Sequence, residues 1–259
     1  MKHSIFDRKI LKIHRDRTGA QENKQVQDLY CDILERAAIY RPKFETVLNI
    51  GSRINDLKPL TPLKINNLIT TDLSLKAMQG AKGIKVQADE EALPFRDESF
   101  DLIISVLNLH WVNDLPGTLI QIRKALKKDG LFIANIIGGN SLKELKSVFV
   151  KTESDLGLSI NFHVSPMITA QTMAELMQRA KFQDIVVDQD QIEILYNHPS
   201  NLMGDIKNLA ESNCMNNGKI RYLRKDVLDL FCKNYFAMFP SNEGGIRCGL
   251  DVITFMGYK

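Results

Sequence analysis

Residues 100–139 read FDLIISVLNLHWVNDLPGTLIQIRKALKKDGLFIANIIGG. This stretch begins and ends with short, almost continuously apolar runs (100–112 and 131–139), which are typical of strands buried on both faces of a parallel sheet. Between them, the apolar residues of 115–130 recur at helical spacing, and Gly130 stands where glycine commonly closes a helix. The sequence therefore predicts a strand, a crossover helix over 115–130 and a second, parallel strand.

The same alternation extends on both sides of this unit. A helix expected over about 20–41 ends before Pro42, because a residue that precedes proline disfavours the helical conformation. Such alternation predicts an α/β fold with a doubly wound parallel sheet and helices on both faces. The further strands are expected at TVLNIGS (46–52), NNLITTDLS (66–74), IKVQADEE (84–91), DIVVDQDQIEILY (184–196) and GLDVITFMGYK (249–259), and the further helices at 141–157 and 169–182, with helix and loop over 198–240.

The domain organisation expected from this pattern is an N-terminal helical segment (1–40) followed by one α/β domain (41–259). Helical insertions are expected within that domain at about 141–180 and 198–243. The first residues, MKHSIFDRKILKIHRDR, are interpreted as a solvated amphipathic helix, with a lid or a partner-docking arm as the alternative. The residues expected to be partly packed there are Ile5, Phe6, Leu11 and Ile13.

Composition excludes several classes of protein. Hydrophobic residues make up 44% of the chain and charged residues 25%, which excludes a disordered chain, a collagen-like fibre and a disulfide scaffold. The 34 Lys and Arg nearly balance the 31 Asp and Glu, so the net charge of +3 does not indicate a nucleic-acid partner. No CxxC spacing occurs, so neither a zinc site nor a redox pair is expected. The four cysteines are Cys31, Cys214, Cys232 and Cys248.

Localisation is predicted from the absence of targeting signals. No run of 18 apolar residues exists in the sequence, so no transmembrane segment is expected, although peripheral membrane association stays open. The N-terminal stretch lacks the apolar region of a secretory signal and carries Asp7 and Asp16, which transit peptides avoid. We therefore expect a protein of the bacterial cytoplasm with reduced thiols.

Polar residues and glycines stand at the ends of the expected strands, where open parallel sheets bind their ligands. A carboxylate such as Asp72 can accept hydrogen bonds from both hydroxyls of a ribose, and Asp89 could accept from an adenine amino group. Gly51 lets the backbone approach a ligand closely. The set predicts a nucleoside-containing cofactor, with Asp72 as a turn or helix-cap residue as the alternative. The other strand-end positions are Glu90, Asn108 to Trp111, and Gly138 with Gly139.

The stretch from ADEEALPFRDESF to GGNSLKEL (88–145) resembles class I S-adenosylmethionine-dependent methyltransferases of the type-11 kind. Within that superfamily the sequence is most similar to the complex I assembly factor 5 family, and it also resembles the malonyl-carrier-protein O-methyltransferases of biotin synthesis. The strings LHWVNDLP and GGNSLKEL are the most specific. The other strings that carry the resemblance are FDRKILKIHRDR (6–17), HVSP (163–166), LMQRAKFQDIVVDQDQIEILY (176–196) and ESNC (211–214).

The resemblance implies a seven-stranded Rossmann-like sheet that binds S-adenosylmethionine. It further implies a protein substrate, an iron–sulfur subunit of complex I, whose arginine is hydroxylated; the mitochondrial relatives act in the matrix. An O-methyltransferase of the biotin-synthesis type and a cofactor-free assembly scaffold are the alternatives. The implied cofactor-binding residues are Gly51, Asp72, Leu73, Asp89, Glu90 and Asn108, and the candidate catalytic residues are Asn108, His110 and Trp111.

The loop after the first strand departs from the superfamily pattern, which is an acid followed by three alternating glycines. This chain reads NIGSRIND (49–56) and keeps Gly51, whereas Arg53 stands at the second glycine. Arginine cannot follow a glycine backbone without strain, so we expect the amino-acid end of the cofactor to be held less well. Pro59 and Pro62 are expected to shorten or break the helix that follows. The other two departures are Asn49 at the acidic position and Asn55 at the third glycine.

Two histidines belong to the strings that carry the resemblance. His110 could exchange a proton or orient a substrate at the mouth of the pocket, whereas the structural alternative makes it a satisfied polar neighbour of a packed Trp111. His163 is interpreted either as a loop residue near the site or as part of a structural turn. No HxxxH or HxxE spacing occurs, so no metal site is expected. No GxSxG motif occurs either.

Overall fold

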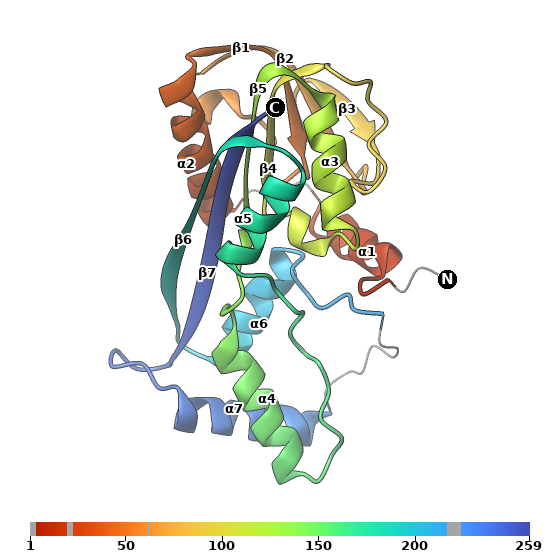
Figure 1. Cartoon of the computed structure of the whole chain (residues 1–259). Helices are drawn as coiled ribbons and strands as arrows, with labels where there is room; N and C mark the ends of the chain where they lie inside the picture. The colour runs from red at the N-terminus through yellow and green to blue at the C-terminus, as the bar shows by residue number, and fades with distance from the viewer. Residues whose placement is uncertain (1–3, 20–22, 62, 217–223) are drawn as a thin grey trace.

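A 7-stranded sheet forms the centre of the computed structural model, which describes residues 4–19, 23–61, 63–216 and 224–259 (Figure 1). The strand order is β3-β2-β1-β4-β5-β7-β6, so the chain winds outward in both directions from β1 and β4. This arrangement confirms the α/β, Rossmann-like prediction. The strands are β1 (Lys43–Ile50), β2 (Lys64–Asp72), β3 (Ile84–Gln87), β4 (Phe100–Val106), β5 (Leu126–Ile137), β6 (Gln183–Tyr196) and β7 (Ile246–Tyr258).

Strands β1 to β5 pair in parallel, and β7 runs antiparallel to both β5 and β6. The apolar runs are buried because helices cover both faces of the sheet. On one face, Tyr30 of α2 (Lys24–Tyr40) packs with Ile104 of β4. On the other face, α3 (Leu115–Ala125) and α5 (Ala170–Arg179) pack against neighbouring side chains of β4 and β5, among them Ile103 and Phe132.

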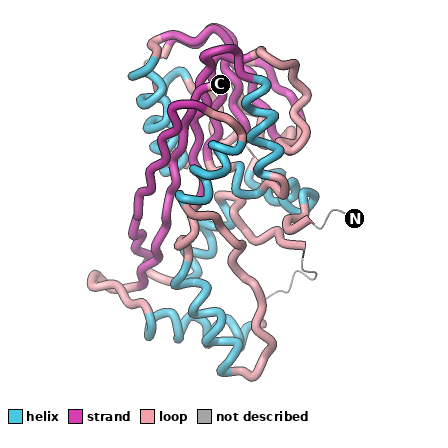
Figure 2. Tube along the Cα trace, in the orientation of Figure 1, coloured by secondary structure: helices cyan, strands magenta, loops and turns pink. Residues whose placement is uncertain are grey.

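Helices gather beyond the carboxyl ends of the parallel strands, in the lower half of Figures 1 and 2. Helices α4 (Lys143–Asp155), α6 (Pro199–Asn208) and α7 (Lys225–Met238) share an apolar cluster there, whose centre includes Phe149 and Phe231. This part therefore lies beside the edge of the sheet where ligands of such folds bind. The division into a segment 1–40 and a domain 41–259 stays a prediction.

The crossover helix ends earlier than predicted. Helix α3 stops at Ala125 and β5 begins at Leu126, so Gly130 does not close the helix as expected. The last helical carbonyl groups find partners elsewhere, because the backbone N–H groups of Glu98 and Ser99 donate to the carbonyls of Lys124 and Ala125 at 2.9 and 2.8 Å. With these partners in place, the helix needs no glycine cap.

The N-terminal helix packs one face on the sheet edge and is less solvated than its sequence predicts. Helix α1 (Arg8–Thr18) is capped by Asp7, whose side chain accepts from the N–H groups of Lys9 and Ile10. Leu11 and Arg15 on its inner face are 0% and 1% exposed. Phe6 is also buried, whereas Ile5 and Ile13 lie half-exposed on the outer side. The helix therefore uses one face for packing, as an amphipathic helix does, and its role as a lid stays a prediction.

The segment between β1 and β2 contains only one helical turn among its described residues, the 3₁₀ turn η1 (Lys58–Leu60). Pro59 stands within this turn and has no N–H group to continue a helix, so the expected shortening is confirmed. Pro62 lies outside the described residues. Within the described part of the chain, no helix is both long and apolar enough to cross a membrane.

Candidate functional site

The ends of β1, β2 and β4 bring Gly51, Asp72 and Asn108 together, as predicted. Gly51 has φ +85°, and a Cβ atom built on it would lie 2.5 Å from Cγ of Asn108. The position therefore requires glycine for its backbone conformation and for the close approach of Asn108. This explains why this glycine of the loop is kept.

Replacing Gly51 by alanine is expected to lower the free energy of unfolding by about 2 kcal/mol or more, because the methyl group meets Asn108 and the backbone is strained. Gly204 in α6 is the matched control, since a Cβ atom added there would meet nothing within 4 Å. Alanine there should stabilise the helix by up to about 1 kcal/mol. Urea unfolding of both variants measures the difference, and equal stability of the two would contradict this role of Gly51.

Asp72 at the end of β2 organises the loop around it. Its Oδ2 accepts from the N–H of Ser52 at 2.9 Å, and its Oδ1 accepts from the N–H of Ser74 at 2.8 Å. The turn interpretation of Asp72 is therefore realised in the structure. Oδ2 keeps a further lone pair, so the same carboxylate could also accept from a ribose hydroxyl.

A guanidinium group from α1 lies against this carboxylate. Nη1 of Arg15 lies 3.3 Å from Asp72 Oδ1 and 3.0 Å from Glu90 Oε1, and Nη2 donates to the side chain of Asn108. The Arg15 side chain is only 2% exposed. Burial alone would raise the pKa of Glu90, but Arg15 and Arg8 hold it at about 2, so Glu90 is ionised.

A second guanidinium covers the end of β3. Arg8 donates to Asp89 at 2.7 Å, to Glu90, and to the backbone carbonyl of Trp111 at 3.1 Å. Asp89 remains about one-third exposed, whereas Glu90 is fully buried. The two acids predicted at this strand end thus differ: Glu90 belongs to a closed ion-pair network, and Asp89 lies at its rim. Leu73 packs beside this network with Phe6 and Leu11.

A separate polar cluster surrounds Glu211, which follows α6. Its carboxylate accepts from Arg53 at 2.7 Å, and from His110 Nε2 and the Trp111 indole N–H at 2.8 Å each. His110 and Trp111 lie in the 3₁₀ turn η2 (Leu109–Trp111) after β4. Burial would raise the pKa of Glu211, but His110 and Arg53 hold it at about 2. Two of the three predicted catalytic residues, His110 and Trp111, thus contact a carboxylate that lies 101 and 100 positions away in the sequence.

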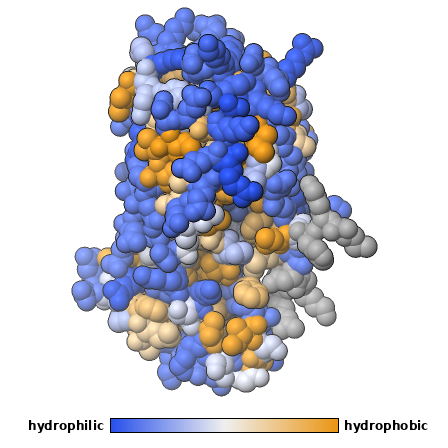
Figure 3. Space-filling model, in the orientation of Figure 1, coloured by the Kyte–Doolittle hydropathy of each residue, from blue (hydrophilic) through white to orange (hydrophobic). Residues whose placement is uncertain are grey.

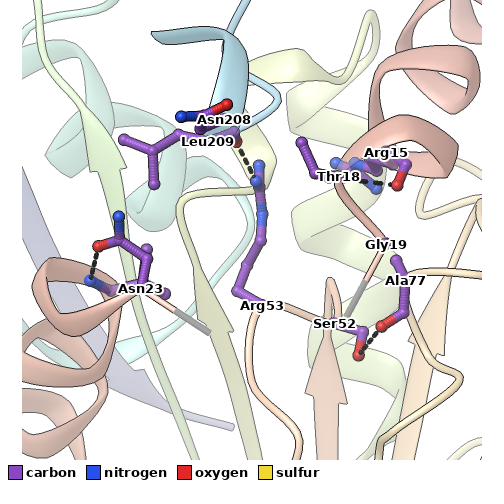
Figure 4. A pocket seen from close by; sticks show the side chains of 10 residues that line it. Arg15, Thr18, Gly19, Asn23, Ser52, Arg53, Ala77, Asn208 and Leu209 are labelled. Atoms are coloured by element: carbon purple, nitrogen blue, oxygen red, sulfur yellow. Dashed lines mark hydrogen bonds between the residues drawn. The ribbon is translucent and has the colours of Figure 1, made fainter. Parts of the chain in front are cut away.

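Arg53 connects the loop to the helical part of the protein. Its guanidinium donates to the carbonyl groups of Leu107 and Leu209 as well as to Glu211. The bond to Leu209 is drawn in Figure 4. The loop therefore forms a side-chain bridge at the position where the superfamily pattern has a small glycine. Figure 4 shows Arg53 extending from the loop towards Leu209, with Arg15 of α1 on the other side of the same cavity.

Two cavities border the Arg53–Glu211 ion pair. Arg53 lines the first cavity and Glu211 lines the second, so the pair stands between them. The first cavity is lined by Arg15, Thr18, Gly19, Asn23, Val26, Ser52, Arg53, Ala77, Asn208 and Leu209. The second is lined by His110, Trp111, Ile137, Leu142, Leu145, His163, Val164, Ser165, Pro166, Met167, Ile206, Glu211 and Asn213.

His163 lies in the wall of the second cavity. Its ring stacks on Phe149 with centroids 3.8 Å apart and 11° between the planes, and its Nε2 lies 2.8 Å from Glu153. The structural and the functional interpretations of this histidine are therefore both compatible with its place. Among the residues that the structure describes, no group of three or more His, Cys, Asp or Glu side chains could hold a metal ion.

The strand-end residues fit the nucleoside of S-adenosylmethionine in type and place, but α1 covers them. Asp72 and Glu90 are 1% and 0% exposed, so a ribose reaches Asp72 only after Arg15 moves away. Ser52 lines the first cavity, and both Gly51 and Ser52 are buried. Binding of the cofactor therefore requires α1 to withdraw its two guanidinium groups.

Acid is expected to destabilise the fold through the two buried carboxylates. The pKa values of Glu90 and Glu211 are lowered from 4.5 to about 2 in the folded chain, so each contributes stability that is present above the unfolded pKa. That contribution, about 3 kcal/mol per group, disappears as pH falls from about 5 to about 2. Urea unfolding across this range should show that the free energy of unfolding falls with pH. In the Glu211→Gln variant this dependence on pH should be weaker. The same dependence of unfolding free energy on pH in the variant as in the unmodified chain would contradict the contribution of Glu211.

Three residues of the site carry no local signal in the sequence. Arg8 and Arg15 belong to the string FDRKILKIHRDR, and Glu211 opens the string ESNC. Ion pairs between residues 75 or more positions apart leave no periodic pattern that local sequence analysis detects. The signal that is present is the resemblance itself, since these strings carry it.

Comparisons with known proteins agree with this geometry. The methyltransferase domain family matches residues 51–134, which span β2 to β4 and most of β5. The mouse arginine hydroxylase NDUFAF5, a mitochondrial protein, is 30% identical over 99% of this chain and 78% of its own length. A putative methyltransferase of Rickettsia prowazekii is 38% identical over 68% of this chain and 78% of its own length.

More distant similarities extend to other methyltransferases. A malonyl-[acyl-carrier protein] O-methyltransferase of Coxiella burnetii is 28% identical over 70% of this chain and 62% of its own length. Among solved structures, the YcgJ protein of Bacillus subtilis superimposes with a TM-score of 0.60 at 14% identity, covering 90% of this chain and 98% of its own. That likeness concerns the fold.

Proposed function

The chain belongs to the S-adenosylmethionine-dependent methyltransferase superfamily and, within it, to the family of the arginine hydroxylase NDUFAF5, and from this premise we propose that it modifies an arginine side chain of a protein. The proposed site for S-adenosylmethionine is the carboxyl ends of β1, β2 and β3. When bound, the cofactor supplies a sulfonium-activated carbon. The proposed substrate is an iron–sulfur subunit of complex I, and the proposed compartment is the bacterial cytoplasm.

The convergence of three distant strings is the observation that carries this proposal. LHWVND, ESNC and FDR meet at one edge of the sheet: Trp111 donates to Glu211, Arg8 donates to the carbonyl of Trp111, and the N–H of Asp7 donates to the carbonyl of Cys214 at 2.7 Å. Strings that carry the resemblance to one family therefore build one contiguous structure beside the cofactor-binding edge. A role in that family's activity explains why these strings meet here.

Specific residues are assigned to the cofactor. Asp72 would accept from the ribose hydroxyls, Asp89 would accept from the adenine amino group, and Gly51 would let the backbone approach the ligand. The guanidinium groups of Arg8, Arg15 and Arg53 face five carboxylates, two more than their own number: those of Asp72, Asp89, Glu90, Glu91 and Glu211. Such a site suits a ligand with net positive charge.

Hydroxylation of an arginine needs an oxidant. Dioxygen with a two-electron reductant balances the reaction, since one oxygen atom replaces C–H with C–OH and the other leaves as water. His110 and Glu211 line the second cavity, where the arginine would be held. Exclusion of water and orientation of the side chain are the contributions that this part of the chain can make.

Complementation tests the proposed function. The chain, directed to the mitochondrial matrix, would be expressed in cells that lack NDUFAF5, and the arginine peptides of complex I iron–sulfur subunits would be analysed by mass spectrometry. We expect one added oxygen on one arginine, and none with an Asp72→Asn variant of equal abundance. Restored complex I without any modified arginine would contradict the proposed activity. Methyl transfer to malonyl carrier protein by the purified chain would favour the biotin-synthesis alternative.

A cofactor-free assembly scaffold is the second candidate function, and one observation favours it. Arg15 contacts Asp72, the residue proposed to accept from the ribose, and is itself fully buried. A scaffold that no longer binds the cofactor would keep such a contact for stability alone. Full complementation by the Asp72→Asn variant would support the scaffold and overturn the cofactor-dependent function.

A further inference from the structure

Two residues that line the second cavity carry buried side-chain atoms without a hydrogen-bond partner among the described residues. Nδ1 of His110 and Oγ of Ser165 both have no partner within the described part of the chain, although both residues line this cavity. The His110 side chain is 6% exposed. Buried polar groups without a partner are uncommon in folded proteins, because each loses its hydrogen bonds to water. Their occurrence together in one cavity points to a ligand that supplies the missing partners.

The chemistry of these atoms defines the missing group. Nε2 of His110 lies 2.8 Å from the Glu211 carboxylate and therefore carries a hydrogen atom, so in the neutral ring Nδ1 is an acceptor. Glu211 acts here as a positioning residue, since it fixes the ring through Nε2. Ser165 Oγ can also accept. The ligand group is thus a hydrogen-bond donor.

The surrounding charges favour a cationic donor. On one wall His110 is hydrogen-bonded to Glu211, and on another wall His163 is hydrogen-bonded to Glu153 at 2.8 Å. The pKa of each of these two carboxyl groups is lowered, so both are ionised at neutral pH. Arg53 already compensates Glu211 at 2.7 Å, so the attraction for a cation comes mainly from Glu153, which an anionic head group would also meet.

Apolar side chains complete the cavity and its surroundings. Its walls include Leu145 and Ile206, which suit a hydrocarbon stem. The segment just before His163, which lines the second cavity, carries two exposed apolar residues. Ile160 and Phe162 are 62% and 69% exposed. Figure 3 shows apolar patches over this helical half of the molecule as well as over the half that contains the sheet. A polypeptide seated on the rim would cover Ile160 and Phe162.

We propose that the second cavity is the seat of the substrate arginine, with His110 Nδ1 and Ser165 Oγ accepting from its guanidinium group. A guanidinium presents five N–H donors in a plane at the end of an apolar stem, which matches the two acceptors and the apolar walls. This inference rests on the proposed function and names the residues that recognise its substrate.

Binding of a small probe tests the seat directly. The probe is the capped peptide acetyl-Gly-Arg-Gly-amide, titrated into the isotope-labelled full chain while the His110 ring and the Ser165 amide are followed by NMR. We expect both signals to shift on binding. The peptide with citrulline in place of arginine keeps most N–H donors but lacks the charge, and we expect it to bind more weakly.

The Ser165→Ala variant separates recognition from folding. Because Oγ has no partner among the described residues, its removal should leave Tm unchanged, while the affinity for the arginine peptide falls about tenfold through the loss of a hydrogen bond to a charged group. Ser147→Ala is the matched control, since its hydroxyl donates to the Lys143 carbonyl on the exposed face of α4. That variant should bind the probe like the unmodified chain.

The outcomes distinguish the seat from the proposed function. Unshifted His110 signals, or unchanged affinity in Ser165→Ala, would overturn the seat, even if cells still show an oxidised arginine. Probe binding that depends on Ser165 would support the seat even if no arginine were modified in cells, and only the proposed function would then fail.

Discussion

Replacing Arg15 by methionine is expected to lower the free energy of unfolding by about 3–5 kcal/mol at neutral pH. The guanidinium lies between the carboxylates of Asp72 and Glu90, all three groups being almost fully buried. Methionine keeps the packing of the stem but leaves two ionised carboxylates with fewer partners. Removing one partner of a buried ion pair is far more destabilising than removing an exposed one.

The control for this prediction is Lys12→Met on the outer side of α1. Lys12 pairs with Asp16 at 2.8 Å, but both side chains are substantially exposed, so we expect a loss below about 1 kcal/mol. The loss of unfolding free energy in Arg15→Met should become smaller in acid, because protonation of Glu90 removes its unpaired charge. Adding Glu90→Gln should restore part of the loss. A deficit as small as that of Lys12→Met would show that α1 does not cover the strand ends.

Truncation of Glu211 to alanine has the second large expected effect, again about 3–5 kcal/mol. The change leaves the guanidinium of Arg53 and the ring N–H groups of His110 and Trp111 buried without their acceptor. It also removes the Arg53–Glu211 ion pair, which joins the loop after β1 to the residues that follow α6. Urea unfolding measures the loss of stability, and NMR of the His110 ring reports whether its position is kept.

A double-mutant cycle isolates the Arg53–Glu211 pair. We expect Arg53→Met and Glu211→Gln to show a coupling free energy of about 1–3 kcal/mol, because the two groups lie 2.7 Å apart and are 9% and 6% exposed. Additive losses would contradict a direct interaction. Arg36 and Asp32 form an exposed pair on α2 and serve as the comparison, with a coupling below about 1 kcal/mol.

The sheet could be predicted from the sequence because its signals are local. The apolar runs around Ile103 and Ile133 are buried on both faces, and this burial is what the uninterrupted pattern indicates. The strand-end position of Asp72 followed from the same reasoning. The end of α3 could not be predicted, because the carbonyl of Ala125 is bonded to Ser99, which is a tertiary contact.

The buried arginines could not be predicted for a related reason. A basic segment with alternating charges is typical of a solvated helix face, and only the folded chain brings Arg15 to Glu90. Arg53 stands out in the sequence as a departure from the glycine pattern, but its partner Glu211 lies 158 positions away. The roles of His110, Trp111 and the strand-end residues in binding and catalysis stay predictions.

Calorimetric titration with S-adenosylhomocysteine tests most directly whether the strand ends under α1 bind the cofactor. The unmodified chain should bind one equivalent, Asp72→Asn should bind much more weakly, and Glu45→Gln on the exposed side of β1 should bind normally. Arg15→Met should bind more tightly, since no guanidinium competes for Asp72. Absence of binding to both the unmodified chain and Arg15→Met would contradict a cofactor site and leave the scaffold as the function.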